Sequence, residues 1–169
     1  MTIAVLALGS NLGNRFDYLQ SAINALGAEM NVIAVSPVFQ TAPVGGPDQD
    51  DFLNAVVKVD TTLDPHGLLL FINHIEEANG RVRTVHWGPR TLDIDIVTFG
   101  NEVLVSDTLT IPHPRAHERA FVLLPWRSID ERAEIPREGS ISEILSVTDT
   151  QGVVLQDDLR LVIPSQDNL

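Results

Sequence analysis

The order of the predicted elements along the chain indicates an α+β fold with a ferredoxin-like sheet. Runs of apolar residues with the length of strands alternate with segments whose apolar residues recur at helical spacing. The predicted order is strand, helix, strand, strand, helix, strand, which is the split βαβ arrangement of ferredoxin-like folds. We therefore expect a βαββαβ sheet with helices on one face, a second face available to a ligand, and extra C-terminal elements.

Local signals define each element of this order. The first helix is predicted over 16–26, with Gly27 as its stop. The second helix opens at Asp64, a good N-cap residue, followed by Pro65 at the first helical position, and it ends at Gly80. The strands are predicted over 3–8, 32–39, 52–59 and 92–97.

Shorter elements are predicted outside this order. Pro37 favours an edge or a bulge in the second strand, because proline cannot donate to a ladder. Ser140 and Glu143 have the spacing of a capping box ahead of a helix. A short helix is predicted over 116–124, short strand pieces over 103–105 and 109–111, and a late hairpin or added strand pair over 153–155 and 159–163.

The composition fits one globular domain over residues 1–164 with a tail over 165–169. The chain has 169 residues, of which 44% are hydrophobic, and a formal net charge of −12, which argues against nucleic-acid and anionic membrane surfaces. It has no cysteine, so disulfides and thiolate metal sites are excluded. The first residues, Met1-Thr2-Ile3-Ala4, do not have the basic n-region of a signal peptide, and no apolar stretch approaches the roughly 20 residues of a membrane span. We expect a cytoplasmic protein, with a monomer as the simplest assembly.

Two aspartates one residue apart in an apolar run, Leu92-Asp93-Ile94-Asp95-Ile96-Val97, are the most informative feature of the chain. Alternation along a strand sends both carboxylates to one face and the isoleucines to the other, into a core. Two neighbouring carboxylates that leave water need cations or protons, and Mg²⁺ takes carboxylate oxygens at about 2.0–2.1 Å. A solvated acidic strand face is the alternative that the motif alone leaves open.

The segment Gly80-Arg81-Val82-Arg83-Thr84-Val85-His86-Trp87-Gly88-Pro89-Arg90 brings three arginines and a tryptophan beside the acidic pair. Guanidinium groups bind phosphate oxygens in a bidentate manner and stay charged. Metal-bound polyphosphate needs this combination, because carboxylates hold the metal while metal and guanidiniums neutralise the phosphates. A cluster of surface salt bridges is the competing interpretation.

Three further segments offer binding groups. The loop Gly9-Ser10-Asn11-Leu12-Gly13-Asn14 lacks the Lys-Ser/Thr ending of a P-loop, so a turn with Asn capping and a ligand contact remain equally open. The Gly/Pro segment 41–51 is typical of a lid or binding loop, and Phe52 and Asn54 share a face at its exit. The segment 111–121 supplies two histidines, two arginines and a phenylalanine around a rigid turn.

The chain strongly resembles the 6-hydroxymethyl-7,8-dihydropterin pyrophosphokinases of folate biosynthesis. Several independent blocks match in family order across residues 3–125, which makes the resemblance more specific than any one motif. The blocks are Leu8-Gly9-Ser10-Asn11-Leu12-Gly13, Thr41-Ala42-Pro43-Val44-Gly45-Gly46, Phe52-Leu53-Asn54-Ala55, Gly80-Arg81-Val82-Arg83, Trp87-Gly88-Pro89-Arg90-Thr91-Leu92-Asp93-Ile94-Asp95, and Pro112-His113-Pro114-Arg115 through Arg119-Ala120-Phe121.

The resemblance implies a ferredoxin-like fold and transfer of the β,γ-pyrophosphoryl unit of ATP to the hydroxymethyl oxygen of the pterin, giving AMP. It implies that Asp93 and Asp95 bind two Mg²⁺ ions and that Arg81 and Arg90 lie nearest the reacting phosphates. The nucleotide-binding residues that it implies are His113, Arg119, Arg83 and Glu76.

The resemblance also implies a pterin pocket. Asn54 should hydrogen-bond the heterocycle, and Phe52 and Phe121 should stack on its two sides. The remaining residues implied to line this pocket are Thr41, Pro43, Val44 and Trp87, the last on a loop that closes.

One position departs from the family pattern, since His86 stands where the family commonly carries an arginine. A partly neutral imidazole would weaken attraction of this loop to phosphate at neutral pH. The family pattern does not cover the chain after Leu145 in detail. Two functions of other classes remain as alternatives: a non-catalytic ferredoxin-like nucleotide or metal-binding module, and a Mg²⁺-dependent phosphohydrolase.

Overall fold

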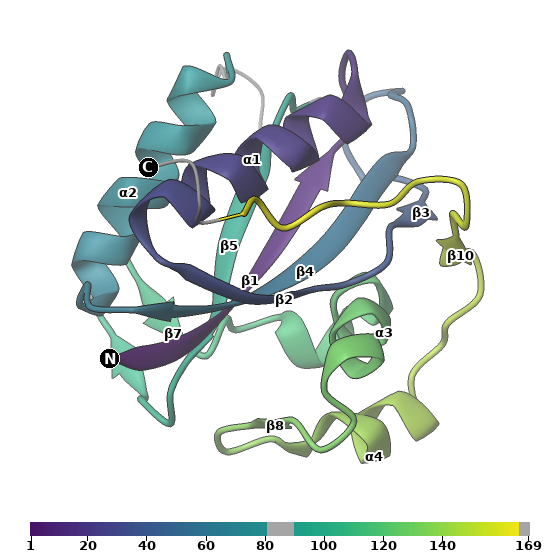
Figure 1. Ribbon diagram of the computed structural model, residues 1–169. Coiled ribbons are helices and arrows are strands. Elements are labelled where there is room, and N and C mark those ends of the chain that lie inside the picture. The colour runs from purple at the N-terminus through teal and green to yellow at the C-terminus, as the bar shows by residue number, and fades with distance from the viewer. Residues whose placement is uncertain (81–89, 166–169) are drawn as a thin grey trace.

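The computed structural model describes residues 1–80 and 90–165 and contains a six-stranded antiparallel sheet with helices on both faces (Figure 1). The elements in chain order are β1 (Thr2–Ser10), α1 (Arg15–Glu29), β2 (Asn31–Val35), β3 (Phe39–Thr41), β4 (Phe52–Thr61), α2 (Pro65–Ala78), β5 (Asp93–Phe99), β6 (Leu104–Val105), β7 (Thr110–Ile111), a 3-10 turn (Ala116–Glu118), α3 (Ala120–Ile129), β8 (Glu134–Ile135), β9 (Gly139–Ser140), α4 (Ile141–Ser146) and β10 (Val154–Leu155).

The strands of the main sheet lie in the order β10-β3-β4-β1-β5, and β2 also pairs with β4. Each of these pairs is antiparallel. The long strands β1 and β4 occupy the centre, where continuous apolar runs are expected because both faces are covered. The predicted combination of helices with a mainly antiparallel sheet is confirmed.

Helices α1 and α2 cover one face of the sheet. Their inward residues recur at helical spacing, so each helix presents one apolar stripe to the strands. Ile94 and Ile96 of β5 are 4% exposed and belong to the core under these helices. Other fully buried members are Leu6, Leu19, Ile23, Leu26, Leu68 and Ile72.

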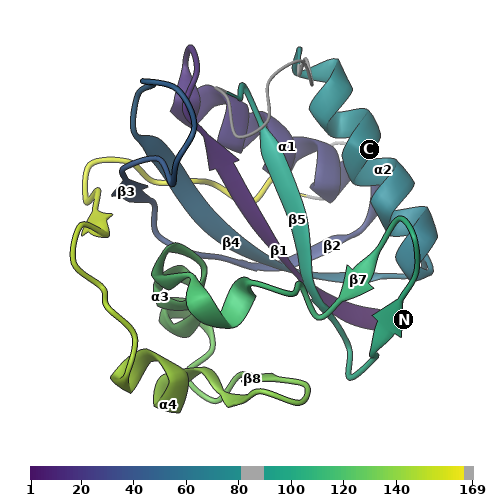
Figure 2. The same cartoon turned by 180° about the vertical axis from the view of Figure 1, so that it is seen from behind.

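The second face is not left open along its whole length, which corrects the prediction of helices on one face only. Figure 2 shows α3 and α4 on the side of the sheet away from α1. Val5, Val56 and Val97 point to this side and form a second core with Leu123 and Trp126 of α3. Three central strands thus carry apolar residues on both faces, and burying both faces requires helices on both sides.

The structure confirms the predicted helix caps. The Asp64 side chain accepts a hydrogen bond of 2.7 Å from the Gly67 backbone N–H at the start of α2, and Pro65 is the first helical residue. The Ser140 hydroxyl accepts from the Glu143 backbone N–H at the start of α4. Both caps satisfy donors that a helix start leaves unpaired.

Three predicted boundaries are wrong. Gly27 lies inside α1 rather than ending it. The predicted strand 32–39 is split into β2 and β3 around Ser36-Pro37-Val38, because proline cannot join the ladder. Residues 159–163 form no strand, so the predicted late hairpin is replaced by the single short strand β10.

The last described residues, 154–164, form a strap that crosses the α1 face of the sheet, yellow in Figure 1. β10 pairs with β3, and the Gln156 N–H then donates to the Val38 carbonyl at 2.8 Å. Further on, Leu159 and Leu161 pack against the core. Gln20 of α1 holds the end of the strap, donating to the Val162 carbonyl at 2.8 Å and accepting from its N–H at 2.9 Å.

None of the helices in 1–80 and 90–165 combines the length and apolar character that a membrane crossing requires.

The strap explains why Gly27 is tolerated within α1. A Cβ atom placed on Gly27 would lie 2.6 Å from the Cγ of Pro164. Glycine inside a helix normally costs about 0.5–1 kcal/mol relative to alanine, so Gly27→Ala should stabilise the protein only where the strap leaves room. In a Pro164→Ala background we expect that gain, and in the wild-type background we expect none or a loss, measured by urea unfolding. An equal gain in both backgrounds would show that the strap does not press on α1.

Candidate active site

A cavity of about 390 Å³ lies on the α3 face of the sheet. Its floor is made by β1, β4 and β5, and one wall by the start of α3 and the segment before it. The Gly/Pro segment after β3 and the turn before β10 complete the rim. The predicted site residues that line it are Thr41, Pro43, Val44, Phe52, Asn54, Arg90, Asp93, Asp95, Arg119 and Phe121.

The two aspartates of β5 point into this cavity, as strand alternation predicts. Asp93 and Asp95 line the pocket, whereas Ile94 between them is buried under α2. β5 lies at the end of the sheet and pairs only with β1 among the described strands. The carboxylates therefore share one face and one cavity.

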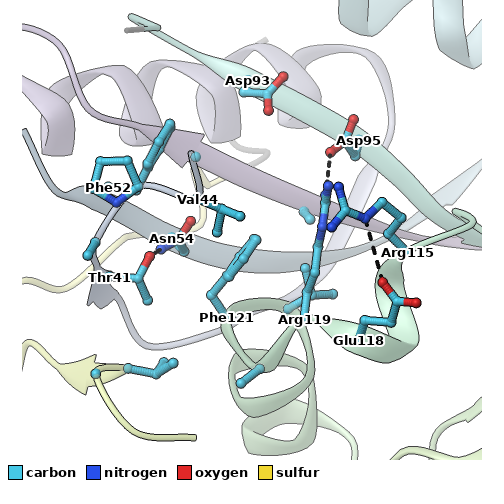
Figure 3. A pocket seen from close by; sticks show the side chains of 18 of the residues that line it. Thr41, Val44, Phe52, Asn54, Asp93, Asp95, Arg115, Glu118, Arg119 and Phe121 are labelled. Carbon is cyan, nitrogen blue, oxygen red and sulfur yellow. Dashed lines mark hydrogen bonds and ion pairs between the residues drawn. The ribbon is translucent and has the colours of Figure 1, made fainter. Parts of the chain in front are cut away.

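Each aspartate faces a cation in this structure. The Arg90 guanidinium contacts the Asp93 carboxylate at 2.8 Å. The Arg119 guanidinium lies 3.8 Å from the Asp95 carboxylate, the pair joined by a dashed line in Figure 3. These arginines come from the end of the segment before β5 and from the residue before α3, so two separate parts of the chain supply cations to one acidic pair.

Asp95 binds its proton unusually tightly. Loss of hydration in the pocket, followed by repulsion from Asp93, raises the pKa of Asp95 to about 7. Attraction by Arg119 lowers the pKa but does not offset these effects. Burial is thus the larger cause of the raised pKa of Asp95, and the neighbouring Asp93 carboxylate adds to it.

His113 lies beside Asp95 without lining the cavity. Its Nε2 is 3.8 Å from the Asp95 carboxylate. Burial and the neighbouring Arg119 lower the pKa of His113 to about 4. At neutral pH the imidazole is therefore uncharged, and its contact with Asp95 is not an ion pair. The Nδ1 atom accepts a hydrogen bond from the Arg115 backbone N–H, which fixes the orientation of the ring.

The opposite end of the cavity is apolar and aromatic. Phe52 and Asn54 of β4 share a face there, as predicted, and Phe121 of α3 lies near them in Figure 3. The Asn54 amide is 5% exposed and donates to the Thr41 hydroxyl at 2.8 Å. A fixed amide between aromatic rings suits the polar edge of a flat heterocycle.

Sequence reasoning missed Gly9 as a lining residue. Gly9 pairs with Asn54 across β1 and β4, and a Cβ at Gly9 would lie 3.5 Å from both the Asn54 Oδ1 and the Phe52 ring. A longer side chain at this position would fill the apolar end. A glycine directly after the apolar run 3–8 could have indicated a residue that lines a pocket, but it equally fits a simple turn. Other unpredicted lining residues are Gln49, Arg115, Glu118, Gln151 and Val153.

Asn11 is the second residue whose role was missed. Its side chain is 1% exposed and donates to the Gln49 side chain at 2.7 Å and the Asp50 carbonyl at 3.0 Å. Its Oδ1 accepts from the Arg90 backbone N–H at 2.8 Å. Asn11 therefore ties the Gly/Pro segment to the backbone of Arg90. Asn14, which was the candidate for capping, makes no side-chain cap.

Glu76 corrects the prediction of a direct nucleotide contact. Glu76 is 2% exposed and lies on α2, on the face of the sheet that α1 and α2 cover, and it does not line the cavity. One carboxylate oxygen accepts from the Ile94 backbone N–H at 3.0 Å. Helical spacing places Glu76 on the buried stripe with Ile72 and Ile75, on the face of the sheet away from the cavity.

Arg81, Arg83, His86 and Trp87 lie outside the described residues. Their predicted roles at the phosphates and in loop closure stay predictions.

A divalent cation fits the acidic end of the cavity. Within 1–80 and 90–165, no three His, Asp or Glu side chains gather as a complete metal site. Mg²⁺ needs no such set, because it usually binds through one or two carboxylates and takes its other oxygens from phosphates and water. Such an ion would neutralise both carboxylates and so relieve the repulsion by Asp93 that, after burial, raises the pKa of Asp95.

Removing the Asn11 side chain should loosen both segments that it ties together. Asn11→Ala leaves the buried Arg90 N–H without its acceptor, a loss worth about 1–3 kcal/mol of unfolding free energy. Asn14→Ala, in the same loop but exposed and without a cap, is the matched control and should change stability by less than about 0.5 kcal/mol. Equal effects of the two substitutions in urea unfolding would contradict this role.

The lowered pKa of His113 predicts a loss of stability in acid. The unfolded chain takes up a proton at His113 below about pH 6.5, whereas the folded protein does so only near pH 4. Stability from this group is full above pH 6.5 and falls toward pH 4, by about 3 kcal/mol at most. Asp95 opposes it, because the folded state takes up a proton there between about pH 7 and 4.

The comparison with His113→Asn isolates the histidine, since the Asn oxygen can still accept from Arg115. Wild type should lose more stability than this variant between pH 7 and 4.5, measured by urea unfolding. Parallel curves would mean that His113 titrates normally.

The sequence matches known proteins over most of its length. A sequence model of the family described as "7,8-dihydro-6-hydroxymethylpterin-pyrophosphokinase (HPPK)" matches residues 5–131. The 2-amino-4-hydroxy-6-hydroxymethyldihydropteridine pyrophosphokinase of Bacillus subtilis is 44% identical over 153 residues, covering 89% of this chain and 88% of that protein. The protein of the same name from Mycobacterium tuberculosis is 41% identical over 177 residues, covering 99% and 93% of the two chains.

A solved structure shares the fold. The crystal structure of wild-type Plasmodium falciparum HPPK-DHPS with SDX-DHP superposes with a TM-score of 0.70 at 17% identity, covering 86% of this chain and 44% of that chain. The family match and the two bacterial relatives carry the assignment that this fold alone would not. The chain belongs to the 7,8-dihydro-6-hydroxymethylpterin pyrophosphokinase family.

Proposed function

We propose that the cavity transfers the β,γ-pyrophosphoryl unit of ATP to the hydroxymethyl oxygen of 6-hydroxymethyl-7,8-dihydropterin. As a member of its family, the chain is an ATP-dependent pyrophosphokinase of folate biosynthesis. The pterin oxygen attacks the β-phosphorus, the bond between that phosphorus and the α,β-bridging oxygen breaks, AMP leaves, and the hydroxyl proton is released. The observation that carries the proposal is a single cavity with an acidic, arginine-rich end and an aromatic end.

The acidic end is proposed to hold the phosphates and two Mg²⁺ ions. Asp93 and Asp95 are the proposed ligands, because both carboxylates line the cavity and lie close enough for Asp93 to raise the pKa of Asp95, after the larger effect of burial. When bound, Mg²⁺ supplies positive charge to the phosphates and orients their oxygens. Loss of the proton from Asp95 would accompany binding, since only the carboxylate form is a ligand.

Arg90 and Arg119 are proposed to exchange partners when substrate binds. In this structure they neutralise Asp93 and Asp95. Once cations neutralise the carboxylates, the guanidiniums become available to phosphate oxygens, which they bind strongly. Arg81 and Arg83 are proposed to act in the same way, and Arg90 with Arg81 to lie nearest the reacting phosphates.

The aromatic end is proposed to hold the pterin between Phe52 and Phe121. Asn54 would hydrogen-bond the polar edge of the ring, and the position of its amide supports this because Thr41 already fixes it. Thr41, Pro43 and Val44 would line the rim. No proton-abstracting group is required, because alignment of the hydroxyl with the β-phosphorus and charge neutralisation carry most of phosphoryl transfer.

The two alternative functions are not favoured. A nucleotide or metal-binding module has no use for a buried amide between two aromatic rings. A phosphohydrolase would cleave ATP with water and would need no second substrate beside the phosphates. The aromatic end of the cavity therefore argues against both.

Two structural proposals accompany the function. We assign the sheet to the ferredoxin-like class, supported by the strand order β3-β4-β1-β5 with helices after β1 and β4. We also propose residues 1–164 as one domain, supported by the strap that returns to pack on α1.

Asp95→Ala should lower the rate of pyrophosphoryl transfer by at least about 10²-fold, the scale of one lost charge contact in a transition state. Asp93→Ala should have an effect of the same order. AMP release is measured with ATP and Mg²⁺, with and without the pterin. Asp107→Ala, an exposed aspartate of a surface turn, is the control and should behave as wild type. Near-normal AMP formation in either pocket variant would refute the metal assignment, and AMP formation that does not depend on pterin would refute the transfer reaction.

A further inference from the structure

We infer that Glu76 is a positioning residue, whose buried carboxylate fixes the backbone of β5 between Asp93 and Asp95 and so aims both side chains into the cavity. The inference rests on the metal-binding role proposed for the two aspartates. It adds a residue that lies on the opposite face of the sheet from the reaction.

The first observation is the position of β5 at the end of the sheet. β5 pairs with β1 on one side, and Leu8 is the partner of Ile94. On the outer side, alternate backbone N–H groups of an end strand have no strand to donate to. The Ile94 N–H donates instead to the Glu76 carboxylate at 3.0 Å. Glu76 thus takes the place that a neighbouring strand would occupy.

The second observation is the identity of the peptide that Glu76 holds. The Ile94 nitrogen belongs to the peptide unit that links Ile94 to Asp93. Fixing this unit fixes the direction in which the Asp93 side chain leaves the strand. The Ile94 side chain is 4% exposed and packs under the helices, so side chain and backbone are both anchored between the two carboxylates.

The third observation is that Glu76 places a carboxyl group in an otherwise apolar, buried stripe of α2. Glu76 is 2% exposed and shares the inner stripe of α2 with Leu68, Ile72 and Ile75. Burying a carboxylate costs free energy unless hydrogen bonds and charges compensate it. An apolar residue would fill the stripe at lower cost but would leave the Ile94 N–H without an acceptor. The hydrogen bond to β5 therefore explains why a side chain with an acceptor oxygen stands at this position.

The charge of Glu76 acts on the cavity as well. Its carboxylate lies directly behind the strand that carries both aspartates, since it accepts from the Ile94 N–H between them. A fixed negative charge behind the aspartates increases the attraction of the pocket for cations. Glu76 should consequently act through two effects, the hydrogen bond that sets geometry and the charge that strengthens metal binding.

Three substitutions separate these effects. Glu76→Gln keeps an oxygen that can accept from Ile94 but removes the charge. Glu76→Asp keeps the charge but is shorter by one methylene and falls short of the Ile94 N–H. Glu76→Ala removes both. Glu77→Ala removes the same charge from the next, exposed position of α2 and is the matched control.

The experiment measures amide hydrogen exchange of Ile94 by NMR, and Mn²⁺ affinity by electron paramagnetic resonance with a non-hydrolysable ATP analogue. Wild type, Glu76→Gln and Glu77→Ala should protect the Ile94 amide, whereas Glu76→Asp and Glu76→Ala should exchange at least tenfold faster. Mn²⁺ affinity should fall at least tenfold in Glu76→Ala and by less in Glu76→Gln. It should be unchanged in Glu77→Ala. If the alanine variant does not fold, the Gln and Asp pair gives the same test.

Two results would overturn the inference. One is an Ile94 amide that stays equally protected in Glu76→Asp and wild type. The other is a lower melting temperature with unchanged Mn²⁺ affinity, which would make Glu76 a purely structural residue. Failure of the proposed metal site is recognised separately, because Asp95→Ala would then bind Mn²⁺ as tightly as wild type.

Discussion

The pairing of two neighbouring carboxylates, Asp93 and Asp95, with two arginines is the interaction on which the rest of the site depends. Burial in the pocket, followed by repulsion from Asp93, raises the pKa of Asp95 to about 7, and the Arg90 and Arg119 guanidiniums lie against the two carboxylates. These guanidiniums are the groups best suited to bind phosphate. A metal-bound triphosphate brings cations to the carboxylates and anions to the arginines at once, so substrate binding can exchange every ion pair without leaving a charge unpaired.

The same constraint shapes the sheet. A strand whose alternate residues are Asp93 and Asp95 cannot be covered on that side by an apolar helix over its whole length. The helical cover on this face therefore packs further along the strands, on Val5, Val56 and Val97, and leaves the aspartates in a cavity. On the other face the buried stripe of α2 combines apolar residues with Glu76, which accepts a hydrogen bond from the backbone of the acidic strand. Alternation along β5 therefore places the cavity on one face of the strand and the core on the other.

The parts that sequence could predict are those set by local pattern. Alternation along 92–97 gave the direction of both aspartates, Asp64 and Pro65 gave the start of α2, and Phe52 with Asn54 gave one face of the pocket. The failures depend on partners distant in the chain. Pro164 leaves little room for a side chain at Gly27, the Arg90 N–H donates to Asn11, and the Ile94 N–H donates to Glu76. None of these partners can be identified without the folded chain. The cover on the second face was missed because the apolar residues of 120–126 had no strand assigned to them.

The two ends of the cavity are joined by one short segment of chain. Arg119 precedes the first turn of α3 and reaches Asp95, while Phe121, two residues on, lines the aromatic end. The Arg119 guanidinium also lies over the Phe121 ring, 5.6 Å from its centre, an arrangement in which cation and ring attract each other. A shift of this segment would move together the cation proposed to bind phosphate and the ring proposed to stack on the pterin. Its rigid attachment to the second core through Val122 and Leu123 therefore keeps the two substrates in register, which in-line transfer between them requires.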